Sequence, residues 1–415
     1  MTLEIEKLRG ELARMATSTA GLRLEQKRRV DLLREVLFSR GGDWEALNAG
    51  LARAEARADP KYFRAARPLH PVESLAVPIR PPAPPGRAIL IASDGSQIMP
   101  NRHAAFLYYL VNVGAIVYFH GENRAPITLS NPRMHYPELQ DDQTEDEPGF
   151  DKSAVTIERD LLEIGTLSDL TWQYAEATQP RLALLDQRLL YYPFGGSDVA
   201  AREAIRQWAK SISDMRESGA LVAGYIDRPG KRSVITLLET LVDKNEIGWE
   251  ELGKRRPPGD DLTDATLYAA LLGPGERSPV FLDVSQANDN FAAEDPLIAA
   301  CFFYLNPGSA RHDGQGPLVE PRTVARVDIP LWIAREPESV ALIHALIVDQ
   351  CKLTGYYPYV LTRAHELAVV GKHDADSLNY MIDLYMQEAG VMGSITAKQS
   401  DKELVGGGRT RFAGP

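Results

Sequence analysis

Two aspartates follow short apolar runs in separate parts of the sequence, and they are the first candidates for chemistry. Asp94 follows the run AILIAS, and Asp186 follows RLALL. A carboxylate at the end of a buried strand is costly to desolvate unless a cation meets it, and a divalent metal is the most effective such cation. Asp-Gly also makes ordinary turns, and a turn explains Asp94 alone equally well. As a pair, the two aspartates favour a metal pocket.

A helical segment between these runs carries further acidic residues. Residues 154–177 have apolar side chains at helical spacing, with Glu158 and Glu163 beside the apolar face. The hard cations Mg²⁺ and Mn²⁺ bind through a few carboxylates at a time and keep water ligands. Two strand aspartates and one helical glutamate meet that demand. Zinc is disfavoured, because the sequence has no HExxH motif or cysteine cluster and its 8 histidines are scattered.

A tyrosine-rich segment near the C-terminus adds two further candidates. Residues 355–365 read GYYPYVLTRAH and contain Tyr356 and His365. A lone histidine is more often a hydrogen-bonded core residue. These two side chains can touch a phosphate, a water or a metal only if the fold returns them to the acidic pocket. The phosphate loops GxGxxG and GxxxxGK[ST] and the nucleophile elbow GxSxG are absent.

The pattern of apolar residues predicts an α/β fold in which a mixed sheet is flanked by helices. Residues 1–40 are expected to be helical and either to pack on the body of the protein or to form a hairpin or partner-contacting arm. Residues 106–119 are expected to be two strands with a tight turn at Gly114, and residues 87–98 a strand that ends near Asp94. The remaining expected strands lie in 180–192, 220–227, 280–284 and 324–333, and the remaining expected helices in 197–219, 233–242, 338–354 and 361–370.

Composition limits the kind of protein. With 44% hydrophobic and 25% charged residues, most of the chain is expected to fold. A net charge of -11 means that any contact with DNA must be local. The longest apolar stretch is too short to cross a membrane and the N-terminus lacks signal-peptide features, so we expect a cytoplasmic protein. Cys301 and Cys351 are expected to be buried thiols, because two cysteines cannot form a disulfide framework.

Six motifs in order resemble the NurA family of nucleases over about residues 87–370. They are Asp-Gly-Ser at 94–96, Arg-x-x-x-Glu at 159–163, Leu-Leu-Asp at 184–186, Gly-Tyr-Ile-Asp-Arg-Pro at 224–229, Arg-Val-Asp-Ile-Pro-x-Trp at 326–332, and Gly-Tyr-x-Pro…Ala-His at 355–365. Each motif is modest alone, but six in order are fairly specific. The resemblance implies a ribonuclease H-like core, a ring-shaped homodimer and a Mn²⁺-dependent DNA nuclease, with Mg²⁺ as a possible alternative metal.

The resemblance also implies partners and residue roles. Family members cut single-stranded DNA internally, resect duplex ends 5′ to 3′ in break processing, and work with a hexameric HerA-type ATPase. By motif, Asp94 and Asp186 match the metal-holding aspartates, and Glu163 matches the helical glutamate, with Glu158 as the alternative. Tyr356 and His365 match the C-terminal tyrosine and histidine of the site. The full set of candidate metal ligands is therefore Asp94, Glu163, Asp186 and His365.

The same comparison suggests a domain division and DNA contacts. We expect a helical arm over 1–75, a proline-rich connector over 76–86, a nuclease domain over 87–385 with an insertion near 243–279, and a flexible tail over 386–415. Arg228, Lys231 and Arg232 can grip a DNA backbone, although an exposed charged loop explains them equally well. Two competing interpretations are a non-catalytic DNA-binding adaptor that regulates a translocase and a scaffold that has no nucleic-acid function.

Overall fold

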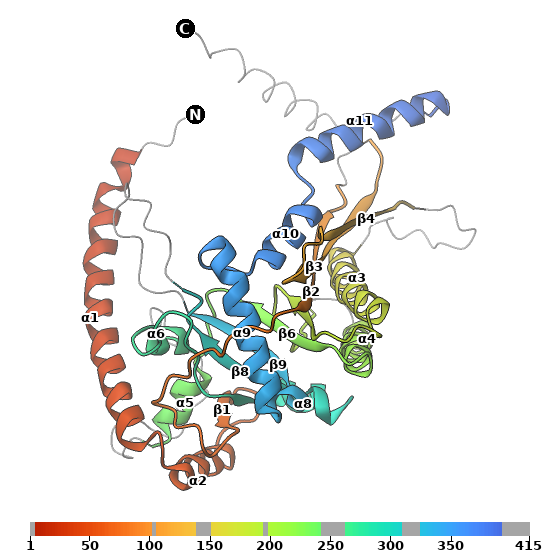
Figure 1. Cartoon of the computed structure of the whole chain (residues 1–415). Coiled ribbons are helices and arrows are strands. Elements are labelled where there is room, and N and C mark those ends of the chain that lie inside the picture. The colour runs from red at the N-terminus through yellow and green to blue at the C-terminus, as the bar shows by residue number, and fades with distance from the viewer. Residues whose placement is uncertain are drawn as a thin grey trace. The chain divides into compact units, whose positions relative to one another are not determined.

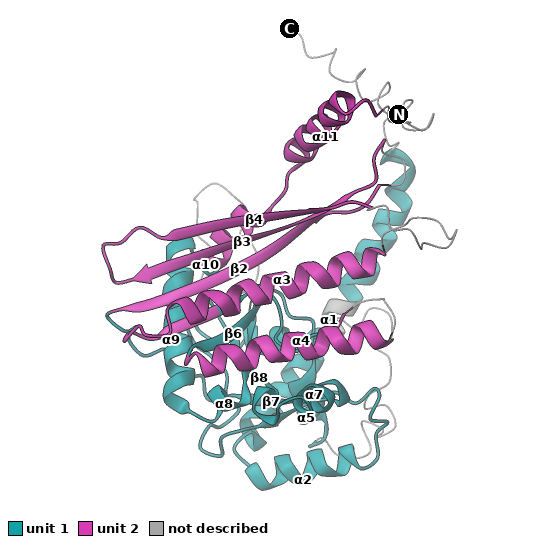
Figure 2. Ribbon diagram, turned by 90° about the vertical axis from the view of Figure 1, so that its right-hand side faces the viewer, with its two compact units in different colours: residues 1–86, 184–191, 220–359 teal, residues 87–183, 192–219, 360–415 magenta. Residues whose placement is uncertain are grey.

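The chain from Ala88 to His135 forms an antiparallel meander, which is part of one of two units in the protein. The computed structural model of the chain (Figure 1) describes residues 5–101, 105–137, 151–193, 198–241, 262–308 and 324–391. Unit 1 comprises residues 1–86, 184–191 and 220–359, and unit 2 comprises residues 87–183, 192–219 and 360–415 (Figure 2). Each unit is therefore assembled from three separate stretches of the chain.

The meander of unit 2 contains the strands β2, Ala88–Ile98, β3, Tyr109–His120, and β4, Ile127–His135. β2 pairs antiparallel with β3, and β3 pairs antiparallel with β4. The first half of β2 is apolar and fully buried, as the run AILIA requires. The strand β5, Arg181–Leu185, follows later in the chain and passes from unit 2 into unit 1 at Leu184.

Helices cover both faces of this meander. α3, Lys152–Gln173, begins at Asp151, whose carboxylate accepts a hydrogen bond from the Ser153 amide as an N-cap. α3 packs on β2 and β3 and lies beside α4, Asp198–Glu217 (Figure 2). On the other face lies α10, Tyr359–Ala368, where the amide of Asn112 donates to the Ala368 carbonyl over 2.8 Å. α11, Lys372–Glu388, follows α10.

Unit 1 is built on a second run of antiparallel strands. Their order is β1–β7–β8–β9–β6, and every neighbouring pair is antiparallel. The strands are β1, Ala65–Pro68, β6, Leu221–Ile226, β7, Phe281–Val284, β8, Ala300–Leu305, and β9, Ala325–Pro330. The helices of this unit are η1, Ile5–Leu8, α1, Arg9–Arg40, α2, Trp44–Glu55, α5, Ser233–Glu239, α6, Asp264–Ala269, α7, Gln286–Ala292, η3, Pro296–Ile298, α8, Leu331–Ala334, and α9, Pro337–Thr354.

The expected helical N-terminal region is confirmed, and α1 has two kinds of surface. Leu33 and Leu37 are buried in an apolar cluster that also contains residues of α2 and α5. Leu12 and Met15 near the start of α1, and Ile5 in η1 before it, are instead 47%, 62% and 62% exposed. The C-terminal part of α1 therefore packs on its own unit, while the N-terminal part presents apolar side chains to solvent.

The expected fold class, a mixed sheet flanked by helices, is also confirmed. In chain order, three antiparallel strands are followed by α3, β5, α4 and β6. Within the described residues, none of the helices is long and apolar enough to cross a membrane. Cys301 and Cys351 are buried free thiols, as expected.

Two local predictions were wrong. Residues 106–119 do not form two strands, because β3 runs unbroken through Gly114, which pairs with both Asp94 and Ser130. A Cβ atom at Gly114 would lie 2.3 Å from the backbone nitrogen of Ala368, so glycine is needed for close packing against α10 and not for a turn. Asp94 does not end its strand either, since β2 continues to Ile98.

Some expectations fall wholly or partly outside the described residues. Of the insertion expected near 243–279, residues 243–261 lie outside them, while α6 occupies part of the remainder. Of the tail expected over 386–415, only residues up to 391 are described, and α11 extends to Glu388. The division of the chain into arm, connector, nuclease domain and tail stays a prediction.

Candidate active site

Asp94 and His365 form a hydrogen-bonded pair in unit 2. The Nδ1 atom of His365 lies 2.7 Å from Oδ2 of Asp94, although the two residues are 271 positions apart in the sequence. Side chains alternate along a strand, so Asp94 and Ser96 point to the same face of β2. The Ser96 hydroxyl donates to the carbonyl of Ala368 over 2.5 Å, which places α10 on that face. The fold therefore returns the C-terminal histidine to the first strand aspartate.

The geometry of this pair determines what the histidine can do. An ionised carboxylate only accepts hydrogen bonds, so Nδ1 of His365 carries the proton that it shares with Asp94. The other ring nitrogen, Nε2, takes no part in this contact. The His365 side chain is 62% exposed, whereas that of Asp94 is 19% exposed. Asp94 thus orients an imidazole whose second nitrogen can exchange protons with a substrate.

Glu163 lies on the α3 side of β2. Its side chain belongs to a residue that is only 3% exposed, and its backbone carbonyl accepts a hydrogen bond from Ser93 over 3.0 Å. Gly95 faces α3 as well. A Cβ atom added at Gly95 would lie 3.3 Å from Oε2 of Glu163 and 2.7 Å from Cγ of Arg159. The glycine of the Asp-Gly-Ser motif therefore leaves room for the side chains of α3.

Arg159 supplies positive charge to this acidic region, and sequence reasoning did not assign it to the site. Burial alone would lower the pKa of its guanidinium, but the charges of nearby carboxylates outweigh burial and raise it. These carboxylates are Asp160, Glu163 and Asp94. The signal was present in the sequence, because Arg159 lies one helical turn before Glu163 on the same face of α3.

Glu158, the alternative helical glutamate, lies in a different environment. Its carboxylate accepts a hydrogen bond from the Tyr109 hydroxyl over 2.7 Å and lies 2.9 Å from Nε2 of His135. The rings of Tyr109 and His135 are stacked with centroids 4.6 Å apart. Burial, followed by the hydrogen bond and charge of Glu158, raises the pKa of Tyr109. Glu158 is therefore engaged by two aromatic side chains of β3 and β4.

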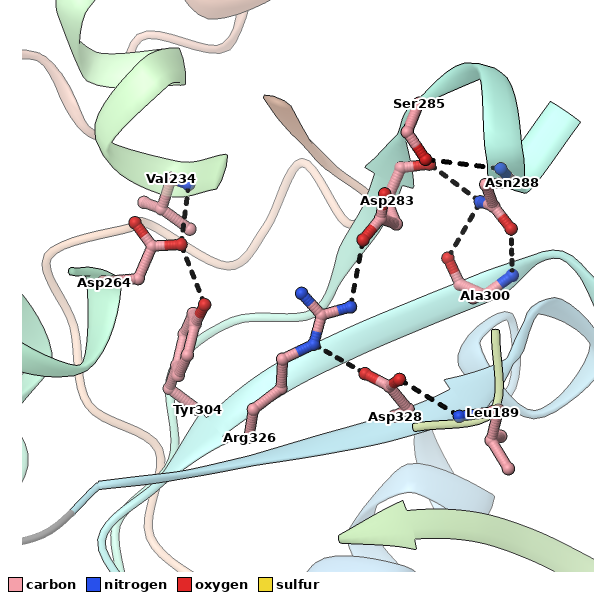
Figure 3. Close-up of polar contacts among 10 residues, drawn as sticks. All are labelled: Leu189, Val234, Asp264, Asp283, Ser285, Asn288, Ala300, Tyr304, Arg326 and Asp328. Carbon is pink, nitrogen blue, oxygen red and sulfur yellow. Dashed lines mark hydrogen bonds and ion pairs between the residues drawn. The ribbon is translucent and has the colours of Figure 1, made fainter. Parts of the chain in front are cut away.

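Asp186 belongs to unit 1, where it directly follows β5 and is exposed. The segment after it is fixed by a buried ion-pair network (Figure 3). Asp328 accepts a hydrogen bond from the Leu189 amide over 3.2 Å and from Nε of Arg326 over 2.6 Å. Arg326 also donates to Asp283 over 3.0 Å. The predicted meeting of Asp186 with Asp94 stays a prediction, because the two residues belong to different units.

The other predicted residues of unit 1 differ in their surroundings. Tyr356 is 55% exposed and follows Gly355, whose φ of 102° ends α9 in a left-handed turn. The side chain of Arg228 is 78% exposed. Arg232 is instead bound to Glu239 over 2.6 Å, so its guanidinium has a structural partner. Of the predicted DNA contacts, Arg228 is the most accessible to a DNA backbone. Arg232 is the least suited to bind DNA, because it is already paired with Glu239.

The donor chemistry fits a hard divalent cation. Asp94 and Glu163 supply carboxylate oxygens, which Mg²⁺ and Mn²⁺ prefer, and such ions keep several water ligands. The negative charges of Asp94 and Glu163 both raise the pKa of the Arg159 guanidinium. A positive charge is therefore favourable in this acidic region. In the part of the chain that the structure describes, no group of three or more His, Cys, Asp or Glu side chains is arranged to hold a metal. A complete ligand set therefore stays a prediction.

Buried Asp264 makes the stability of unit 1 depend on pH. Burial raises its pKa from 3.8 to about 6, despite hydrogen bonds from Ile235, Val234 and Tyr304 that lower it. Because the pKa is higher in the folded state, the folded protein binds more protons between these values. The contribution to stability is fully present below pH 3.8, is still large at pH 4, and is lost as the pH rises through about 6.

We therefore expect Asp264→Asn to alter the pH dependence of unfolding. The unfolding free energy of wild type relative to the variant should rise by on the order of 3 kcal/mol between pH 7 and pH 4. Urea titrations at both pH values measure it. Asp289→Asn, at an exposed position of the same unit, is the control. A difference between wild type and Asp264→Asn that is the same at both pH values contradicts the prediction.

Comparisons with known proteins agree with the motif order. The sequence model of a protein family described as the NurA domain matches residues 89–370. The crystal structure of the NurA nuclease from Sulfolobus solfataricus is similar in fold, with a TM-score of 0.52 and 13% identity over 94% of this chain and 98% of that chain. A type 1 RNase H, LC9-RNase H1, matches 42% of this chain and 82% of its own at 11% identity, with a TM-score of 0.21. The comparison with curated proteins finds no match.

Proposed function

We propose that this chain, which belongs to the NurA family, is a metal-dependent deoxyribonuclease. The proposed reaction is hydrolysis of phosphodiester bonds, internally in single-stranded DNA and from the 5′ end at duplex ends. Mn²⁺ is the proposed cofactor, with Mg²⁺ as a substitute. The site residues are the motif residues Asp94, Glu163, Asp186, Tyr356 and His365.

The observation that best supports this proposal is the pairing of Asp94 with His365. Two of the six motifs supply these residues, and they meet at 2.7 Å although 271 positions separate them. A histidine held by a carboxylate, with its other nitrogen exposed, is suited to proton transfer. On the α3 face of β2, Glu163 adds a carboxylate beside Gly95, and the charges of both Asp94 and Glu163 raise the pKa of the adjacent Arg159. A purely structural histidine has no need of such exposure.

The residues of the chain have distinct proposed roles. A bound divalent ion, held by Asp94, Glu163 and Asp186, would supply stabilisation of the charge on the attacking and leaving oxygens. Asp94 keeps the His365 ring in one orientation, and His365 protonates or positions a group on the phosphate. Tyr356, which is 55% exposed, orients the phosphate or stacks on a base. Arg159 balances the carboxylates in the absence of substrate.

The proposed biological setting also comes from the family. We place the protein in the cytoplasm as a homodimer that processes DNA double-strand breaks together with a hexameric HerA-type ATPase. Copurification with such an ATPase and stimulation of cleavage by its ATP hydrolysis test this partnership. Light scattering of the purified chain tests the dimer, and a monomer at micromolar concentration would contradict it.

A direct experiment tests the activity itself. Purified protein is incubated with end-labelled single-stranded DNA in Mn²⁺, in Mg²⁺, and in Mn²⁺ with excess chelator. We expect cleavage that requires the metal and is strongest with Mn²⁺. DNA that stays whole in both metals, or cutting that continues at full rate in chelator, contradicts the proposal. The products from 5′-labelled and 3′-labelled duplexes then give the polarity.

A matched pair of substitutions on α3 tests which glutamate serves the site. We expect Glu163→Gln to reduce cleavage about a hundredfold, because it removes a charge beside Gly95 that the metal requires. Glu158→Gln should retain activity within about threefold, because this residue is bound by Tyr109 and His135. Initial rates on the same single-stranded substrate measure both. Equal losses in the two variants, or a larger loss in Glu158→Gln, would reassign the helical ligand.

A further inference from the structure

Unit 1 contains a group of cations close to one another that the proposed chemistry does not use. Lys231 lies just before α5, and its backbone carbonyl accepts a hydrogen bond from the Asp264 amide over 2.9 Å. Arg188 is exposed and lies two residues after Asp186. Arg64 is half-buried and precedes β1, with its guanidinium bonded to the carbonyls of Phe63 and Lys61. These residues come from three separate stretches of the chain.

The electrostatic surroundings of Lys231 are mostly positive. Burial lowers the pKa of its ammonium, and the charges of Arg326, Arg188 and Arg64 lower it further. Asp283 is the one carboxylate among its strongest electrostatic neighbours. Asp283 is already bound to Arg326 over 3.0 Å. Placing several like charges near a half-buried ammonium is unfavourable unless an anion joins them.

A second observation comes from the buried end of this group. Arg326 is 4% exposed, and its Nε and Nη2 atoms are bound to Asp328 and Asp283. Its Nη1 atom is buried and has no hydrogen-bond partner among the described residues. Figure 3 shows this third nitrogen pointing away from both carboxylates. An unpartnered buried guanidinium nitrogen is costly, and an anion or a water can satisfy it.

We propose that these four residues, which we call the cationic cluster, form a binding site for a phosphate group: Arg64, Arg188, Lys231 and Arg326. In this cluster Arg188 is exposed, Lys231 is half-buried, and buried Arg326 has one nitrogen without a hydrogen-bond partner among the described residues. Lysine and arginine are the side chains that bind phosphate oxygens by charge-assisted hydrogen bonds. Arg188 is two residues from Asp186, so the bound phosphate is close to the segment of a candidate metal ligand.

Which molecule supplies the phosphate group depends on the proposed function. If the chain cuts DNA, the cluster holds a backbone phosphate near the scissile bond and helps to set the register of the strand. The same chemistry accepts a free phosphate ion. Of the three DNA contacts expected from the sequence, this assignment retains Lys231 and adds Arg64 and Arg188, while Arg232 is bound to Glu239.

Binding without catalysis tests the site. A labelled single-stranded oligonucleotide is titrated in chelator, with fluorescence anisotropy as the readout, against wild type, Lys231→Gln and Arg188→Gln. We expect each variant to bind about tenfold more weakly and to lower the slope of log affinity against log salt by about one. Lys210→Gln, at a lysine that is paired with Asp214 on the exposed face of α4, should bind as wild type does. Inorganic phosphate should raise the thermal midpoint of wild type and not that of Lys231→Gln.

The outcomes separate this inference from the proposed function. Loss of both oligonucleotide and phosphate binding assigns the cluster to the DNA backbone, and loss of phosphate binding alone assigns it to a free phosphate ion. Both variants binding both probes as wild type does would overturn the site, even if the protein cuts DNA. Weaker binding by the variants of a protein that shows no cleavage in any metal would keep the site and overturn the nuclease. Thermal midpoints of the variants in buffer establish that they are folded.

Discussion

Asp94→Asn is expected to reduce cleavage of single-stranded DNA about a thousandfold while leaving the fold intact. The substitution keeps the size of the side chain and an oxygen that can accept from His365. It removes the negative charge that is proposed to hold the metal and that lies against Nδ1 of His365. Initial rates in saturating Mn²⁺ measure the loss, and circular dichroism with thermal unfolding reports on the fold.

A matched control makes this result specific. Asp169→Asn removes a carboxylate from an exposed position of α3, six residues beyond Glu163, and should leave the rate within about twofold. Affinity for the oligonucleotide in chelator should be similar in wild type and in both variants. An Asp94→Asn protein that cuts at more than a tenth of the wild-type rate would remove this aspartate from the proposed mechanism. Cleavage would then have to be assigned to other carboxylates.

Gly114→Ala is expected to destabilise the protein by about 3 kcal/mol. The added Cβ atom would lie 2.3 Å from the nitrogen of Ala368, 2.5 Å from the carbonyl carbon of Leu367 and 2.7 Å from the oxygen of Ala364. All three are backbone atoms, so no side chain can rotate away, and α10 must move off the sheet. His365 is on this helix, and cleavage should fall together with stability. Urea unfolding measures the loss.

A second glycine provides the comparison. Gly165 lies within α3, and a Cβ atom there has nothing within 4 Å. Gly165→Ala should therefore stabilise the protein by about 0.5–1 kcal/mol, because alanine has the higher helix propensity. Opposite signs for the two variants are the expected result. If Gly114→Ala unfolds at the same urea concentration as wild type, β3 and α10 are not packed as closely as the structure has them.

Where the sequence signal was local, prediction worked best. Most helices and strands followed from apolar periodicity, and β5 ends at Leu185, directly before Asp186. The two errors in the meander had one cause. Gly95 and Gly114 were interpreted as turn residues, but cross-strand pairing continues through both. Their glycines are required by side chains of α3 and by the backbone of α10, which no local window can reveal.

Several strands and helices were missed, and for three of these elements the reason can be identified. β8 is the fully buried run ACFFYL, a signal that was present but was not used. β4 is almost entirely exposed and contains Pro132, so it has no apolar alternation to recognise. α11 buries only Ile382 and therefore lacks a strong apolar face. Such elements are defined by their neighbours more than by their own residues.

For the candidate site too, some features could be predicted from the sequence and others could not. The residue types came from the sequence and the motifs, and the pairing of Asp94 with His365 is consistent with them. Periodicity and composition cannot bring together residues that far apart in the chain, so the motif order was needed to connect them. The role of Arg159 was missed, because a cation near carboxylates on a helix is usually a surface ion pair.

The distance along the chain between Asp94 and His365 also has a consequence for synthesis. The 271 residues between the two positions take roughly tens of seconds to translate. During that interval the ribosome carries a polypeptide that contains the aspartate but not yet the histidine. A messenger cut short, or translation stopped before the final helices, therefore yields a protein without the pair. Any activity that depends on the pair can therefore begin only after translation has passed His365.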